Sequence, residues 1–114
     1  MRGLTTIAFL TFALALFPMA RALHAQTPDA GMKVYAAQKC SICHAIAGQG
    51  NKKLPLDGVG VKLSADQIRE WILTPAEAAK KAKSEVKPAM RAYPALPKAD
   101  LDALVAYLKS LDKK

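Results

Sequence analysis

Both cysteines of the chain lie in one pentapeptide, Cys40-Ser41-Ile42-Cys43-His44. The two thiols are three positions apart, and an imidazole follows the second thiol directly. The pentapeptide stands between a segment whose residues favour a helix and a glycine-rich loop, residues 47–61. Its C-x-x-C-H spacing is the most specific functional signal in the sequence.

The C-x-x-C-H spacing predicts covalent attachment of one c-type haem. Each thiol can add across one haem vinyl group to form a thioether, and sulfurs at this spacing reach both vinyl groups from a single turn. The histidine that follows then offers an imidazole nitrogen to the iron. We therefore expect Cys40 and Cys43 to hold the haem and His44 to bind its iron.

Three other interpretations of the cysteine pair are weaker. A disulfide between Cys40 and Cys43 would close too small a loop to stabilise the chain much. A thioredoxin-like redox pair needs a βαβ context, which the sequence does not show. A zinc site needs four ligands, whereas the two cysteines and His44 make three, with no second cluster.

Length and composition restrict the class of protein. The 114 residues are 52% apolar and 23% charged, which indicates one globular domain and excludes collagen-like and disordered chains. Two cysteines cannot build a disulfide-dense scaffold, and no internal repeat is visible. A domain of this size is marginally stable unless something adds to its core, and we expect the haem to do so.

Residues 1–25 have the three-part layout of a secretory signal peptide. Arg2 gives a positive start, an apolar run covers residues 4–17, and small residues offer competing cleavage sites after Ala22 and Ala25. An uncleaved membrane anchor is the alternative, but the apolar run is shorter than the roughly 18 residues that a span requires. We therefore expect cleavage and export.

The exported domain is expected to comprise residues 26–114 and to be periplasmic and soluble, without stable membrane insertion. Loss of Arg2 and Arg21 lowers the formal net charge from +8 to +6. Loss of His24 leaves His44 as the one histidine of this domain.

The second axial ligand follows by elimination, because the exported domain offers only Met32 and Met90. Met32 lies on the predicted helix that leads to Cys40, and a rigid helix cannot curl round to the opposite face of the haem. Met90 lies in a proline-flanked segment that can pass over that face, so we predict Met90 as the ligand. A merely packed Met90, with an open or water-bound iron, is the alternative. A His/Met pair raises the reduction potential and suits reversible electron transfer.

The apolar spacing predicts an all-α domain, with no alternation typical of strands. Residues 84–97 hold three prolines and are expected to be irregular. The main helices are predicted at about residues 30–40, 65–73 and 98–111, with a short helix near 75–83.

Local signals place the ends and faces of two of these helices. Asp29 is the predicted N-cap of the first helix, whose buried face includes Val34 and Ala37. Ser64 and Gln67 form a predicted capping box at the start of the second helix.

With these features the chain resembles the class I cytochromes c, which carry one haem with His/Met ligation. The resemblance covers roughly residues 31–111 and, besides the pentapeptide, rests on Gly31, Tyr35, Pro55, Gly58-Val59-Gly60, Trp71-Ile72, Pro75, Met90 and Leu104-Val105-Ala106-Tyr107-Leu108. It implies three main helices around the haem, with the first and last crossing closely where Gly31 meets Tyr107.

The resemblance also implies roles for individual residues. The carbonyl of Pro55 would accept the N–H of His44. Trp71 and Tyr93 are possible haem contacts, including partners for the haem propionates, or else plain core residues. The chain departs from the family in two places. Arg91 stands where many members have a proline after the ligand methionine, and Pro97 takes the usual polar cap position of the last helix.

The expected function is that of an electron carrier that cycles Fe(III)/Fe(II) without substrate turnover and is not an enzyme. Lysines flank the attachment and methionine segments, where the family exposes its haem edge: Lys33, Lys39, Lys52, Lys53 and Lys87. A basic protein steers toward acidic partners, so we expect acidic redox proteins such as a dehydrogenase, a cytochrome complex or a terminal oxidase, and no nucleic acid. The alternative is that these lysines are ordinary solvated charges.

Two other functions compete with a free carrier. The chain could bind gas or react with peroxide at a haem whose Met90 is weakly held. It could also be a dedicated electron-accepting subunit of one dehydrogenase complex, which the sequence does not distinguish from a shuttle.

Overall fold

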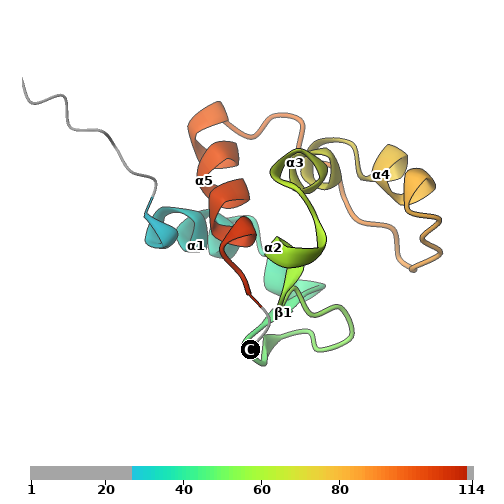
Figure 1. Cartoon of the computed structure of the whole chain (residues 1–114), viewed down its shortest axis with the longest axis horizontal. Coiled ribbons are helices and arrows are strands. Elements are labelled where there is room, and N and C mark those ends of the chain that lie inside the picture. The colour runs from blue at the N-terminus through green and yellow to red at the C-terminus, as the bar shows by residue number, and fades with distance from the viewer. Residues whose placement is uncertain (1–26, 113–114) are drawn as a thin grey trace, which may run out of the picture.

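The computed structural model describes residues 27–112, so the predicted signal peptide, residues 1–25, lies outside the described residues. Helices make up most of this part of the chain, as Figure 1 shows, and the predicted all-α architecture is confirmed. The elements in chain order are α1 (Pro28–Ala37), the 3₁₀ turn η1 (Cys40–Ile42), β1 (Ala45–Ile46), β2 (Gln49–Gly50), α2 (Val59–Lys62), α3 (Ala65–Leu73), α4 (Pro75–Lys81) and α5 (Lys98–Lys109).

The first and last helices, α1 and α5, cross in direct contact (Figure 1). At the crossing, a Cβ on the buried Gly31 would collide with the Cβ of Tyr107 and the carbonyl oxygen of Ala103. Only glycine allows the two backbones to approach this closely. The predicted contact between Gly31 and Tyr107 is therefore confirmed.

The core lies where α1, α3 and α5 meet. Its buried side chains are Val34, Ile68, Ile72, Leu101, Leu104, Val105, Tyr107 and Leu108. Burial of these apolar side chains is the main stabilising term that the chain itself supplies. Helices α3 and α5 thereby present one apolar wall to residues 40–44, which we call the attachment segment.

The predicted end and face of the first helix are corrected. Helix α1 ends at Ala37, because Lys39 adopts a left-handed conformation with φ of 56° that turns the chain into η1. Val34 is buried as predicted, but Ala37 is exposed. Thr27 occupies the N-cap position instead of Asp29, which lies in the first turn, where its negative charge favours the helix N-terminus.

The starts of α3, α4 and α5 are as predicted. The capping box of α3 is present: the Ser64 hydroxyl accepts from the Gln67 amide at 3.2 Å, and the Gln67 side chain accepts from the Ser64 amide at 2.9 Å. Pro75 opens α4, and Pro97 is the N-cap of α5 without a side-chain hydrogen bond. Residues 84–97 form no helix or strand.

The glycine-rich loop is more ordered than the sequence predicts. Strands β1 and β2 pair antiparallel, with Ala45 opposite Gly50 and Ile46 opposite Gln49. The short helix α2 follows within the same loop. Two-residue strands are too short to show an alternating pattern, which is why this hairpin was missed. Within residues 27–112, no helix has the length and apolar character that a membrane span requires.

Candidate functional site

A cavity of about 690 Å³ opens between the attachment segment, helix α3, helix α5 and residues 84–93. This volume lies in the usual range for cofactor sites, roughly 300–1,000 Å³. Cys40, Cys43, His44 and Met90 all line it. The apolar part of its wall includes Leu54, Leu56, Ile68, Ile72, Leu104 and Leu108. The structure thus brings the predicted haem-binding side chains to one apolar chamber.

The two cysteines are placed by the η1 turn at the end of α1. The amides of Cys43 and His44 both donate to the carbonyl oxygen of Cys40, at 3.2 and 3.0 Å. Both cysteines are free thiols, Cys40 half-buried and Cys43 exposed. Burial raises the pKa of the Cys40 thiol. One tight turn of the backbone therefore carries both cysteines and His44.

The His44 ring is fixed by a backbone carbonyl. Its Nδ1 lies 3.0 Å from the carbonyl oxygen of Leu54, which also accepts from the Ala45 amide at 3.4 Å. A carbonyl can only accept, so Nδ1 carries the proton and Nε2 keeps its lone pair for a metal. The predicted partner, Pro55, is corrected: the carbonyl belongs to the residue before it. Pro55 is exposed and bridges to Ala45, which places the Leu54 carbonyl against the histidine.

Tyr35 supports the same histidine from helix α1. Its hydroxyl donates to the His44 carbonyl oxygen at 3.4 Å, and its ring meets that of Tyr107 edge-on with centroids 6.3 Å apart. Burial, with a smaller contribution from Cys40, raises the pKa of Tyr35 to about 12. The hydroxyl therefore stays protonated and remains a donor at physiological pH.

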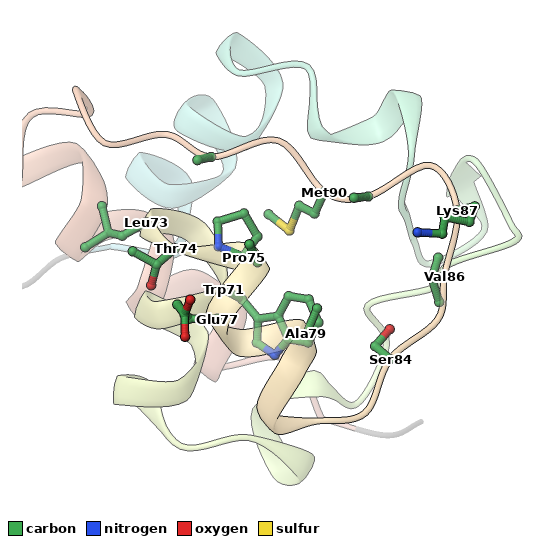
Figure 2. Close-up of a pocket in the computed structure, with 13 residues that line it drawn as sticks. Trp71, Leu73, Thr74, Pro75, Glu77, Ala79, Ser84, Val86, Lys87 and Met90 are labelled. Atoms are coloured by element: carbon green, nitrogen blue, oxygen red, sulfur yellow. The ribbon is translucent and has the colours of Figure 1, made fainter.

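Met90 lies where the main cavity adjoins a smaller groove of about 460 Å³, and both are lined by Met90 and Trp71. Figure 2 shows the Met90 side chain extending from its segment toward Pro75. Met32, by contrast, is 49% exposed on helix α1.

Tyr93 anchors the segment that carries Met90. Its amide donates to the Ile72 carbonyl at 2.9 Å, and its hydroxyl donates to the Gln38 carbonyl at 3.4 Å. The Arg91 guanidinium lies over its ring, 5.4 Å from the centroid. Both predicted haem contacts, Trp71 and Tyr93, line the cavity, and Tyr93 in addition ties residues 84–97 to α3 and to the end of α1.

The charged residues on the cavity wall are all basic. They are Lys39, Lys53, Lys62, Lys87 and Arg91, and no carboxylate occurs among the described residues that line the cavity. An apolar chamber with a basic rim suits a large apolar group that bears acidic substituents, as haem does. The sequence suggested only Trp71 and Tyr93 as partners for the propionates, so these basic side chains were not expected in that role.

Among residues 27–112, no three His, Cys, Asp or Glu side chains converge as a protein-held metal requires. A haem brings four nitrogen ligands of its own, so it requires only axial donors and attachment points from the protein. The donors on the wall, two thiols, an imidazole and a thioether, fit that requirement.

Comparison with known proteins decides the family. The model of the Cytochrome c family matches residues 28–112, nearly all of the described chain. This chain belongs to the cytochrome c family. Its cofactor is haem c, attached covalently through the C-x-x-C-H motif, and its helices have the arrangement of the class I cytochrome c fold. No curated protein and no solved structure matches the chain.

Two participants in the site were missed by sequence reasoning. Leu54 acts through its backbone carbonyl, which no side-chain pattern reveals. Asn51 forms hydrogen bonds to the attachment turn. A polar residue directly after Gly50 in a loop was the available signal, but it does not identify a partner.

Proposed function

We propose that this cytochrome c is a periplasmic one-electron carrier with His44 and Met90 as axial ligands, and that it is not an enzyme. The observation that carries the proposal is the shared cavity: His44 lines it from the attachment segment and Met90 lines it from residues 84–93. When bound, the haem iron supplies reversible Fe(III)/Fe(II) chemistry. A His/Met pair favours electron transfer over oxygen activation.

The protein residues hold the cofactor and exclude water. Cys40 and Cys43 would tether the ring, and the Leu54 carbonyl holds the His44 imidazole in the tautomer that leaves Nε2 free. The apolar wall formed by Ile68 and Leu104 keeps the surroundings of low polarity. No proton transfer or substrate pocket is needed for this role.

We infer acidic redox proteins as partners and the periplasm as the location. Lysines surround the cavity, and Lys39, Lys53 and Lys87 line its wall, so a negatively charged partner would be steered to the haem. The signal-peptide layout of residues 1–25 supports export.

A second candidate function is haem-based binding of gas or peroxide. It is favoured by one observation: within residues 27–112, no hydrogen bond involves residues 85–92, the stretch that carries Met90. A methionine ligand on a segment without these hydrogen bonds could be displaced from the iron by gas or peroxide.

Optical spectra separate the two functions. The purified protein is recorded oxidised, reduced with dithionite, and reduced under carbon monoxide. A carrier shows the red-edge charge-transfer band of a methionine–Fe(III) bond and no change with carbon monoxide. Ready binding of carbon monoxide by the unmodified protein would contradict the proposal and favour the sensor or enzyme.

A further inference from the structure

We propose that Asn51 is a positioning residue that holds the haem-attachment turn and His44 in place and thereby sets the reduction potential of the iron. The inference rests on the proposed carrier function, because it concerns the imidazole that binds the iron. It adds a residue that the cofactor chemistry alone does not point to. Asn51 is half-buried, lines the cavity and lies in the loop after β2.

Three backbone carbonyl groups of the attachment segment accept hydrogen bonds from Asn51. The Asn51 amide lies 3.1 Å from the Ser41 carbonyl oxygen and 3.0 Å from that of His44. The side-chain Nδ2 donates to the Ile42 carbonyl oxygen at 3.1 Å. A short turn has few hydrogen-bond partners of its own, so these contacts fix the backbone between the two cysteines.

The other polar side-chain atom of Asn51 acts on the loop that leads to Leu54. Its Oδ1 accepts from the Lys53 amide at 3.1 Å, which closes an Asx turn. That turn leads directly to Leu54, whose carbonyl lies 3.0 Å from Nδ1 of His44. Asn51 thus closes a ring of hydrogen bonds that runs from the attachment turn to the imidazole.

The preceding residue, Gly50, allows the loop backbone to lie close to the attachment turn. Gly50 has φ of 105°, a conformation that other residues rarely adopt, and a Cβ there would collide with the His44 carbonyl oxygen. The loop backbone therefore packs directly against the turn, and the Asn51 side chain reaches both Ile42 and Lys53.

The hydrogen bond to Nδ1 has an electronic consequence. A carbonyl that accepts from Nδ1 makes the imidazole a stronger donor at Nε2. A stronger donor favours the more highly charged Fe(III) and lowers the reduction potential. Weakening the Leu54 contact should therefore raise the potential.

The test compares three variants of the haem-loaded protein. Asn51→Ala removes both side-chain bonds, whereas Asn51→Ser keeps a hydroxyl that accepts from the Lys53 amide more weakly. Gln67→Ala is the matched control, since it also removes a neutral side-chain amide that accepts from the backbone, in the capping box of α3. The readouts are the solvent exchange of the His44 Nδ1 proton, measured by nuclear magnetic resonance, and the reduction potential.

We expect Asn51→Ala to speed exchange of the Nδ1 proton at least fivefold. It should also shift the redox equilibrium at least threefold toward Fe(II), about 28 mV for a one-electron couple. Asn51→Ser should fall between Asn51→Ala and the unmodified protein, and Gln67→Ala should lower stability without changing either readout.

The inference is wrong if Asn51→Ala matches Gln67→Ala in both readouts, if its potential falls, or if Asn51→Ser restores nothing. Failure of the proposed function is distinguishable, because it appears in the unmodified protein as carbon monoxide binding without a methionine–iron band.

Discussion

The two sides of the haem cavity are held in different ways. On the histidine side, residues 40–57 form a dense network in which backbone, Asn51 and Leu54 all bond to the attachment turn. On the methionine side, no hydrogen bond among residues 27–112 involves residues 85–92, and hydrogen bonds hold the segment at its ends, at Ser84 and Tyr93. Hydrogen bonds within the chain position His44. Under the proposed ligation, the bond between Met90 and the iron would supply the restraint that residues 85–92 lack.

This contrast has a functional consequence. Under the proposed ligation, His44 would keep the iron tethered in both oxidation states, and the segment that carries Met90 would decide whether the sixth coordination site is closed. The proposed carrier and the alternative sensor would then differ in the strength of the bond between Met90 and the iron.

The largest effect is expected when the haem is lost altogether. Cys40→Ala combined with Cys43→Ala should give a chain that neither retains haem nor folds at room temperature. The apolar walls of the cavity, whose volume is about 690 Å³, would lose their contacts with the haem and face water. Circular dichroism during heating tests this. Cooperative unfolding of the double variant at an unchanged midpoint would show that the hydrogen-bonded histidine side folds without the cofactor.

Removing Met90 should open the methionine side and leave the histidine side intact. Met90→Ala should keep covalent haem, bind carbon monoxide or imidazole, and lower the reduction potential by roughly 0.1–0.3 V, because a thioether favours Fe(II). Peroxidase-like activity should rise. Met32→Ala, at a 49% exposed position, is the control and should change none of these. An open site in the Met32 variant and a closed one in the Met90 variant would reverse the ligand assignment.

The lysines of the loop between β2 and α2 test whether the histidine side also docks partners. Lys52→Glu with Lys53→Glu should slow electron transfer to an acidic partner at low ionic strength. The unmodified protein should itself slow as the Debye length falls from about 30 to 8 Å. Stopped-flow kinetics measure both effects.

The matched control is Lys80→Glu with Lys83→Glu, which makes the same charge change at exposed positions outside the cavity wall. Electron-transfer rates that do not depend on ionic strength, or that fall equally in the two double variants, would show that this loop does not dock the partner.

The smallest effect is expected when one hydroxyl is removed from either side of the cavity. The hydroxyls of Tyr93 and Tyr35 each donate to a backbone carbonyl at 3.4 Å, one on the methionine side and one on the histidine side. Either change to Phe should cost about 0.5–1 kcal/mol of stability. Tyr93→Phe alone should raise the affinity for imidazole, by about two- to fivefold, as titration would show. Equal affinities in the two variants would mean that Tyr93 does not restrain Met90.

Local features of the fold were predictable from the sequence, and long-range ones were not. The capping box of Ser64 and Gln67 and the haem-attachment motif each depend on residues a few positions apart, so their chemistry shows in the sequence. Resemblance to the family added the contact of Gly31 with Tyr107, which the structure confirms.

The errors concern where the backbone turns. Pro55 was predicted to supply the carbonyl for His44, but the position of that carbonyl depends on the hairpin and on the Asx turn of Asn51, which place Leu54 there instead. The end of α1 was misplaced because Lys39 adopts a left-handed conformation. No residue type in this segment favours that conformation, so the sequence did not predict it.

Amide hydrogen exchange of Met90→Ala against the unmodified haem protein tests the contrast most directly. The amides of Asn51 and Leu56 are bonded on the histidine side, to His44 and Ala45, and the amide of Tyr93 is bonded to Ile72 on the methionine side. We predict that Met90→Ala strongly reduces the protection of the Tyr93 amide and leaves that of Asn51 and Leu56 unchanged. Equal loss of protection on both sides, or none at Tyr93, would contradict the claim that the chain holds His44 and the iron holds Met90.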